Sequence, residues 1–198
     1  VRFLYVARIN PVKGINEFLE MFNKLDLEAE LSIIGKTNNL RHQKKFKNLI
    51  ENTKNIKFPG YVSNRKELID TYDNHNILIL PSYTEGQPYV VDESLVRRRP
   101  VLIFEDIAHI IKGRKGIFVS KRNLESFTKT TRFIIKNYRS LVIFPIFYLN
   151  AHSYFLHKIF PVHLIQPPSD WPEEMMENEN KSSFPLPPVL SIPFSPMP

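Results

Sequence analysis

Apolar residues along this chain gather in six short runs, and polar segments with apolar positions at helical spacing separate them. The runs that predict strands are 2–7, 31–34, 56–58, 77–80, 101–104 and 116–119. Helices are predicted over 17–24, 40–52, a segment ending at Tyr72, a segment ending near Val96, and 124–138, with 107–115 an irregular loop or short helix. Continuous apolar strands alternating with helices are typical of a parallel sheet covered on both faces. We therefore predict an α/β fold with a doubly wound, Rossmann-like sheet over residues 1–140.

Two helix starts carry polar residues of the kind that cap helices. Asn16 is the predicted N-cap of the helix beginning at Glu17, and Ser63 is the predicted N-cap of the helix ending at Tyr72. The basic run 97–99 closes the segment that ends near Val96, where positive charge complements the helix dipole.

Residues 141–198 have a different composition from the preceding part. Residues 141–165 are apolar and aromatic but are broken by prolines and histidines, so they do not predict a membrane helix. Of the 16 prolines, 11 lie in residues 141–198, which disfavours a packed core. We predict an irregular or disordered tail and leave two interpretations open. It is either the product of read-through or of a shifted reading frame at the end of a partial gene, or a docking tail whose segment 184–188 adopts polyproline II.

The charge of the chain favours anionic ligands. The formal net charge is +7, and the basic excess lies in residues 1–140, because the rest carries only Lys158 and Lys181 against five acidic residues. Nucleotide diphosphates or an anionic membrane face would suit such a domain. No nucleic-acid-binding motif appears, so nucleic acid is not an expected partner. Cysteine is absent and the six histidines lack metal-ligand spacing, so no metal site is predicted.

The most informative stretch is 81–93, PSYTEGQPYVVDE. It follows the apolar run 77–80, passes through a turn, and enters a helix. Glu85 therefore lies at the carboxyl end of a strand, and Glu93 lies about one turn into the next helix. In open α/β sheets this edge binds ligands, and a helix N-terminus suits phosphate.

This stretch resembles the donor-site motif of the retaining GT-B glycosyltransferases, most closely those of family 4. In that family a Pro-Ser pair after a strand precedes Glu-Gly-x-Pro, and a second Glu follows eight residues after the first. Glu85, Gly86, Pro88 and Glu93 match. An Arg and a Lys-Gly in the first turn of the family grip the diphosphate, and Arg8, Lys13 and Gly14 match these, although Ala7 replaces the usual glycine.

The resemblance implies a role for each matching residue. Glu85 is the catalytic-site carboxylate and positions the donor sugar, and Glu93 accepts hydrogen bonds from the ribose hydroxyls. Backbone groups near Tyr61 and Val62 read the base. The remaining implied donor contacts are the N–H groups around Gly86, Gln87, Pro88 and Tyr89.

The resemblance also implies what the whole protein does. A UDP-, GDP- or ADP-sugar would donate its sugar, with retention and without a metal cofactor, to a glycan or lipid-linked acceptor in surface polysaccharide synthesis. Val1 stands directly in a predicted strand, so we expect the sequence to be the C-terminal, donor-binding half of a GT-B enzyme, inactive without its N-terminal acceptor domain. The expected location is the cytoplasm, in peripheral contact with the membrane face.

Two other functions stay open. One is a non-catalytic nucleotide- or polyanion-binding module whose Pro-rich tail docks a partner. The other is a dinucleotide oxidoreductase, which requires a Gly-x-Gly-x-x-Gly turn after the first strand; the turn 8–14 has only its last glycine.

Overall fold

A computed structural model describes residues 1–36, 40–53 and 55–143. The predictions for the tail, including its proline-rich docking segment, lie outside these residues from position 144 onward. Within the described part, six strands form one parallel sheet in the order β3-β2-β1-β4-β5-β6. This is the strand order of a doubly wound Rossmann sheet, so the predicted fold class is confirmed.

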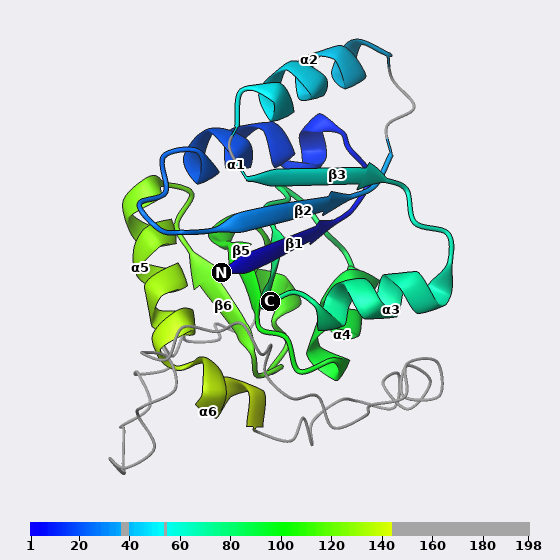
Figure 1. Cartoon of the computed structure of the whole chain (residues 1–198). Coiled ribbons are helices and arrows are strands. Elements are labelled where there is room, and N and C mark those ends of the chain that lie inside the picture. Colours follow the sequence, from blue (N-terminus) through cyan, green and yellow to red (C-terminus); the bar gives the residue numbers. More distant parts are fainter. Residues whose placement is uncertain (37–39, 54, 144–198) are drawn as a thin grey trace, which may run out of the picture. The chain divides into compact units, whose positions relative to one another are not determined.

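The strands lie close to the predicted runs. They are β1 (Arg2–Val6), β2 (Glu30–Ile34), β3 (Ile56–Gly60), β4 (Ile77–Leu80), β5 (Val101–Phe104) and β6 (Ile117–Ser120). The arrowheads of β1, β2 and β3 point to the same edge of the sheet (Figure 1). Pro59 lies on β3, an edge strand, where its missing N–H interrupts no central ladder.

Helices cover both faces of the sheet. The helices are α1 (Ile15–Phe22), α2 (Leu40–Glu51), α3 (Arg65–Asp73), α4 (Tyr89–Val96), α5 (Leu124–Lys136) and α6 (Tyr138–Ile143), with 3-10 turns η1 (Pro11–Lys13) and η2 (Glu105–Ile110). Figure 1 shows α1 and α2 on one side of β1, β2 and β3, with α3 and α4 on the other.

Alternate residues of β1 pack into the hydrophobic cores on the two faces of the sheet. Phe3 packs edge-to-face against Phe22 of α1, with ring centroids 5.9 Å apart. Leu4 belongs instead to the cluster that joins Tyr72 of α3 and Leu95 of α4. This alternation follows from the period-2 geometry of a strand.

Both predicted N-caps were wrong. Helix α1 begins after Gly14, whose left-handed backbone (φ 63°) ends η1, so Asn16 lies inside the helix. Helix α3 is capped by Asn64, which accepts a hydrogen bond from the Glu67 N–H, one residue later than Ser63.

Three other boundaries and environments differ from the predictions. The helix predicted over 124–138 ends at Lys136, and α6 follows it after Asn137. The 107–115 segment begins within η2. Arg97 and Arg99 are buried rather than simply facing a helix end: Arg97 pairs with Asp73, and Arg99 donates to the Tyr138 hydroxyl at 2.9 Å.

Candidate functional site

The candidate site is a pocket at the carboxyl ends of β1 and β4. These neighbouring strands send their chains to opposite faces, β1 into α1 and β4 into α4, which makes their ends the topological switch point of the sheet. The pocket has a volume of about 280 Å³. Its lining is drawn from the ends of the two strands and the loops that follow them: Val6, Ala7, Arg8, Lys13, Leu80, Glu85, Gln87, Pro88, Tyr89 and Val90.

The structure brings together six of the predicted site residues in this lining. Arg8 and Lys13 come from the loop after β1, whereas Glu85, Gln87, Pro88 and Tyr89 come from the loop after β4. The two sets are more than 70 positions apart in the sequence. Their meeting is a consequence of β1 and β4 pairing in parallel at Phe3–Ile77 and Leu4–Leu78.

Lys13 and Glu85 form an ion pair at the centre of the site. The Lys13 Nζ lies 2.5 Å from Glu85 Oε1, with side-chain exposures of 19% and 9%. The fully buried Ser82 donates its hydroxyl to the same oxygen at 2.7 Å. Two donors on one carboxylate oxygen hold the Glu85 side chain in a single orientation.

Arg8 is the other cation of the pocket, and its side chain is exposed. Among the described residues it forms no ion pair. Its backbone carbonyl accepts a hydrogen bond from Tyr5 Oη at 3.1 Å, which fixes the chain at the exit from β1. Burial, with a contribution from the charge of Glu85, raises the pKa of Tyr5, so this phenol stays neutral and remains a donor.

The two loops of the site are joined at further points. The Tyr83 N–H donates to the Val12 carbonyl at 2.9 Å. Gly14 approaches Pro81 so closely that a β-carbon on it would lie 2.1 Å from the Pro81 oxygen. Gly14 is therefore required for backbone packing and does not itself line the pocket.

Glu93 lies on α4 four residues after Tyr89, on the same face of the helix, but does not line the pocket. The Tyr72 hydroxyl donates to Glu93 Oε2 at 2.7 Å. Burial raises the pKa of Glu93, and this hydrogen bond acts in the opposite direction. Burial also raises the pKa of Tyr72 well above its ordinary value, so Tyr72 stays a donor.

The remaining predicted residues lie near the same edge of the sheet without lining the pocket. Tyr61 follows β3 and is 62% exposed, with Lys36 Nζ 4.9 Å from its ring centroid. Val62 packs against the core beside α3 and α4. Gly86 is exposed, and nothing lies within 4 Å of where its β-carbon would be, so a ligand has room to approach its backbone.

Sequence reasoning missed Arg122, which holds the loop after β4 from the far side. Its guanidinium donates to the Pro81 carbonyl at 2.9 Å and the Ser82 carbonyl at 3.0 Å, and it pairs with Asp106 at 2.8 Å. It also stacks on Tyr83, 4.0 Å from the ring centroid. Arg122 precedes the predicted helix at Leu124 as one cation among many, so no local pattern marked it.

His109 was also missed, because no local sequence pattern distinguishes it from the other histidines. Its Nε2 lies 2.7 Å from the Glu85 carbonyl oxygen, so η2 supports the backbone of the residue whose side chain pairs with Lys13. Ser82, by contrast, was part of the recognised motif, and its bond to Glu85 gives that motif position a structural meaning.

The described residues contain no group of three or more His, Asp or Glu side chains that could hold a metal ion. Among these same residues, no helix is long and apolar enough to span a membrane. What the pocket does offer is two cations, one fixed carboxylate, and the N-terminus of α4 at a ligand-binding edge. This set can bind a diphosphate together with a hydroxyl-bearing group.

Comparison with known proteins identifies the class to which this fold and site belong. The family model of the glycosyl transferases group 1 matches residues 1–137. The chain therefore belongs to the glycosyl transferases group 1 family. No curated protein sequence gives a significant match.

Several solved structures share the fold. HepE from Anabaena, solved in complex with UDP-glucose, superposes with a TM-score of 0.61 at 13% identity over 80% of this chain and 44% of its own. Sucrose-phosphate synthase from Thermosynechococcus elongatus gives 0.60 at 17% identity, with the same two coverages. The C-terminal domain of the group 1 family protein LpcC from Francisella tularensis gives 0.57 at 19% identity over 79% of this chain and 84% of its own.

The chain spans less than half the length of HepE and of sucrose-phosphate synthase, but most of the isolated C-terminal domain of LpcC.

Proposed function

We propose that this chain is the donor-binding domain of a retaining, family 4 GT-B glycosyltransferase that takes its sugar from a nucleotide-sugar. The observation that carries the proposal is the pocket at the β1–β4 switch point, where Arg8 and Lys13 meet Glu85. Family membership favours this function over the oxidoreductase and the non-catalytic binding module. Because HepE, a protein of the same fold, was solved with UDP-glucose, a UDP-sugar is the first donor to test.

In the proposed complex Arg8 and Lys13 neutralise the diphosphate as it leaves, without a metal ion. Cationic groups placed where charge develops lower the barrier most when they are already fixed. Lys13 is fixed by Glu85, and the backbone of Arg8 by Tyr5. Glu85 positions the donor sugar. Glu93 binds the ribose hydroxyls, while the Tyr72 hydroxyl donates to its Oε2.

Departure of the diphosphate from the face that the acceptor attacks explains retention without a protein nucleophile. The acceptor, a glycan or lipid-linked glycan of a surface polysaccharide, would reach the sugar from a separate N-terminal domain. The chain by itself is therefore expected to bind nucleotide and to transfer little sugar. Robust transfer by the 198-residue chain alone would contradict this part of the proposal.

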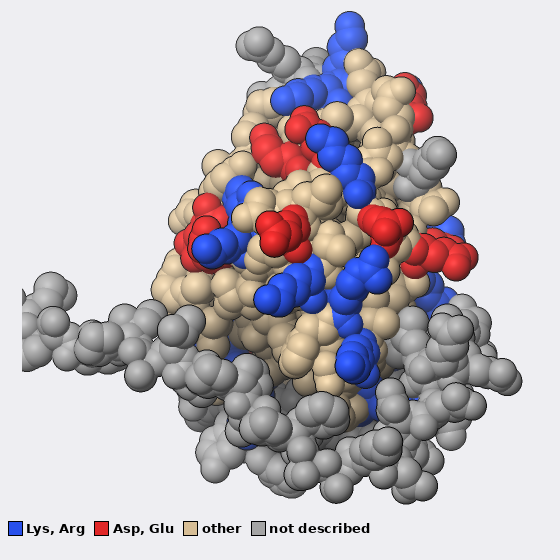
Figure 2. All heavy atoms as spheres, turned by 90° about the vertical axis from the view of Figure 1, so that its left-hand side faces the viewer, with Lys and Arg blue, Asp and Glu red and all other residues tan. Residues whose placement is uncertain are grey.

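The proposed location is the cytoplasm, with α2 near an anionic membrane face. Its exposed Lys44, Lys45 and Lys47 are opposed by the single acid of the helix, Glu51. The face in Figure 2 carries acidic and basic groups side by side, so it offers no comparable surface of one sign.

Calorimetric titration of the full chain with UDP, GDP and ADP tests donor binding. One of the three should bind, and Arg8→Ala should weaken it about tenfold or more, since a hydrogen bond to a charged group contributes about 1.5–3 kcal/mol. Lys44→Ala, which removes an exposed cation on α2, is the matched control and should leave the affinity unchanged. Failure of all three nucleotides to bind, or equal losses in both variants, would overturn the proposal.

A further inference from the structure

The Lys13–Glu85 pair places a fixed negative charge where the diphosphate is proposed to bind. Glu85 Oε1 is 2.5 Å from Lys13 Nζ, so any phosphate that contacts Lys13 lies within a few ångströms of the carboxylate as well. The side chain cannot simply turn away into solvent, because it is 9% exposed and Ser82 holds the same oxygen at 2.7 Å. The neighbourhood is therefore not uniformly positive.

This charge acts differently on a nucleotide-sugar and on the free nucleoside diphosphate. In the sugar ester the terminal phosphate carries one negative charge, because the sugar occupies the third oxygen. When the sugar has left, that oxygen ionises with a pKa near 6, so at neutral pH the diphosphate bears most of an additional charge. A carboxylate beside Lys13 repels this additional charge, whereas it can accept hydrogen bonds from the hydroxyls of a sugar.

We propose that Glu85 is a specificity-determining residue that favours the nucleotide-sugar over the free nucleoside diphosphate, through its ion pair with Lys13. This inference rests on the proposed donor-binding function. The site holds two cations against one acid, which is enough to attract a donor, while Glu85 prevents Lys13 from offering its full charge to the product. Release of the nucleoside diphosphate after transfer is thereby favoured.

The geometry also makes Glu85 suited to discrimination by charge. Its carboxylate is held from one side by Ser82, and its backbone carbonyl lies 2.7 Å from His109 Nε2. A charge that is fixed and partly removed from water interacts more strongly with a neighbouring phosphate than a mobile surface charge does. Discrimination should therefore depend on the charge at position 85 rather than on the overall charge of the domain.

The test measures two affinities on each variant of the full chain. The ligands are the nucleoside diphosphate that binds among UDP, GDP and ADP, and the glucose ester of the same nucleotide. In Glu85→Gln, which keeps the shape of the side chain, the nucleoside diphosphate should bind more tightly and the ester no more tightly. In this variant the ratio of the affinity for the nucleoside diphosphate to the affinity for the ester should rise about tenfold, as expected for one charge at close range in a partly buried site.

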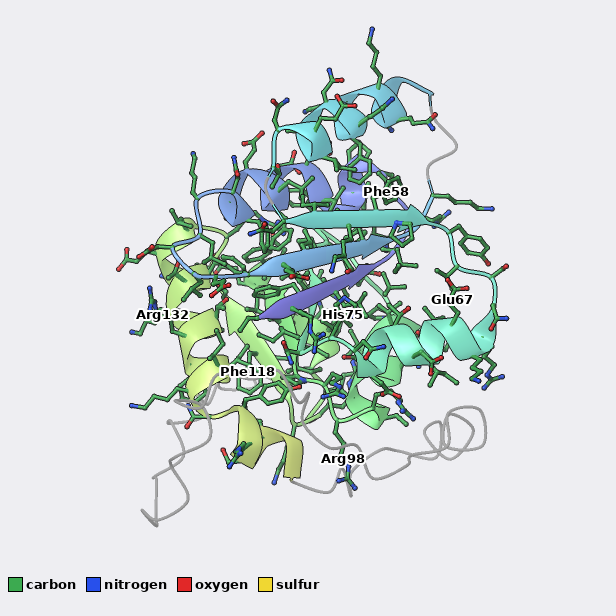
Figure 3. The ribbon with its side chains drawn as sticks, viewed as in Figure 1. Phe58, Glu67, His75, Arg98, Phe118 and Arg132 are labelled. Atoms are coloured by element: carbon green, nitrogen blue, oxygen red, sulfur yellow. The ribbon has the colours of Figure 1, made fainter. Side chains whose placement is uncertain are left out.

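Two controls separate position 85 from general effects. Glu85→Asp keeps the charge and should leave the ratio of the two affinities within about threefold of the parent value. Glu67→Gln removes the same charge from α3, where Glu67 is exposed (labelled in Figure 3), and should leave the ratio unchanged.

The outcomes distinguish this inference from the proposed function. If the parent chain binds neither ligand, the donor-binding function itself fails. If the parent chain binds them and Glu85→Gln leaves the ratio unchanged, or shifts it no more than Glu67→Gln does, the selectivity of Glu85 is overturned while donor binding stands.

Discussion

At the scale of the residue, Glu93 shows a conflict between stability and binding. Its carboxylate is half-buried on α4, and the Tyr72 hydroxyl is its partner in the structure, at 2.7 Å. The side chain therefore has one oxygen engaged within the protein and acceptor capacity remaining for the ribose hydroxyls. Partial burial of an ionised carboxylate lowers the free energy of unfolding of the free protein, and binding of the ligand would offset this cost.

The direction of the pKa shift at Glu93 determines how its contribution to stability depends on pH. Burial raises the pKa from its ordinary value of 4.5, so the folded protein holds this proton more tightly than the unfolded chain does. The contribution of Glu93 to the free energy of unfolding is thus highest at acidic pH, falls as the pH rises from 4.5 through the raised value, and stays low above it.

Glu93→Gln should therefore stabilise the free protein at neutral pH, because glutamine still accepts from Tyr72 and carries no charge. The gain over the parent should be small near pH 4 and should grow with pH before levelling off. Nucleoside diphosphate affinity should fall by up to about tenfold, since the ribose hydroxyls would then donate to a neutral acceptor instead of a charged one. Urea unfolding across pH and calorimetry measure the two effects.

Tyr72→Phe provides the opposite change at the same pair. It leaves the Glu93 carboxylate buried without its donor, and should cost about 1–3 kcal/mol of stability at neutral pH. If Glu93→Gln destabilised the protein at neutral pH as Tyr72→Phe does, Glu93 would be a structural carboxylate rather than one held for a ligand.

At the scale of the element, the site depends on two loops that approach each other closely. Gly14 ends η1 in the left-handed conformation (φ 63°) and begins α1 without a side-chain cap. A β-carbon on it would lie 2.1 Å from the Pro81 oxygen. The loop after β1 can therefore carry Lys13 to Glu85 only with glycine at position 14.

Gly14→Ala should destabilise the protein by at least about 1–2 kcal/mol, from the left-handed backbone alone, with a further loss as Pro81 is displaced. Two glycines separate these causes. Gly113 has φ 76° and open space around it, so Gly113→Ala should show the backbone cost only, and Gly86→Ala, with open space and no positive φ, should change stability little. Urea unfolding of the three variants measures this order, and a loss at Gly14 no larger than at Gly113 would contradict the contact with Pro81.

The strands and the motif residues could be predicted from the sequence, whereas the start of α1 could not. All six strands fall within two residues of the predicted runs. The clearest signal comes from β4 and β5, because a strand buried on both faces is apolar throughout. The N-cap of α1 was predicted wrongly because Asn16 has a capping side chain, whereas the helix starts at a glycine whose role depends on Pro81. The motif residues Arg8, Lys13 and Glu85 were predicted to share a site, and the structure brings them to one pocket.

The supports behind that pocket could not be predicted in the same way. Arg122 and His109 contact backbone carbonyls of the loop 81–85, and they come from segments more than 20 residues further along the chain. Backbone carbonyl groups are the same in every residue, so no side-chain pattern shows which of them a side chain from a distant segment contacts.

At the scale of the whole molecule, α5 joins the last part of the described domain to its beginning. Helix α5 follows β6, the edge strand, yet Phe127 packs against Phe18 of α1 with ring centroids 5.5 Å apart and edge-to-face. The same ring lies 6.1 Å from Phe3 of β1 and 6.2 Å from Phe104 of β5. One side chain thus links the strand that leads to Arg8, the helix that follows Lys13, and a strand of the opposite half of the sheet.

Phe127→Ala should consequently destabilise the domain by about 3–5 kcal/mol, since the site is fully buried and aromatic neighbours on three elements cannot all close the cavity. Phe133→Ala on the same helix is the matched control: its ring is 44% exposed beside Phe118, and its loss should cost about 1 kcal/mol or less. Urea unfolding gives both values. Because Phe127 joins the two halves of the sheet, the parent and Phe133→Ala should each unfold in one transition, by fluorescence and by circular dichroism alike. Similar losses of stability in the two variants, or separate transitions in the parent, would contradict this. They would show that α5 contributes little to the stability of the domain and of the loops carrying Arg8, Lys13 and Glu85.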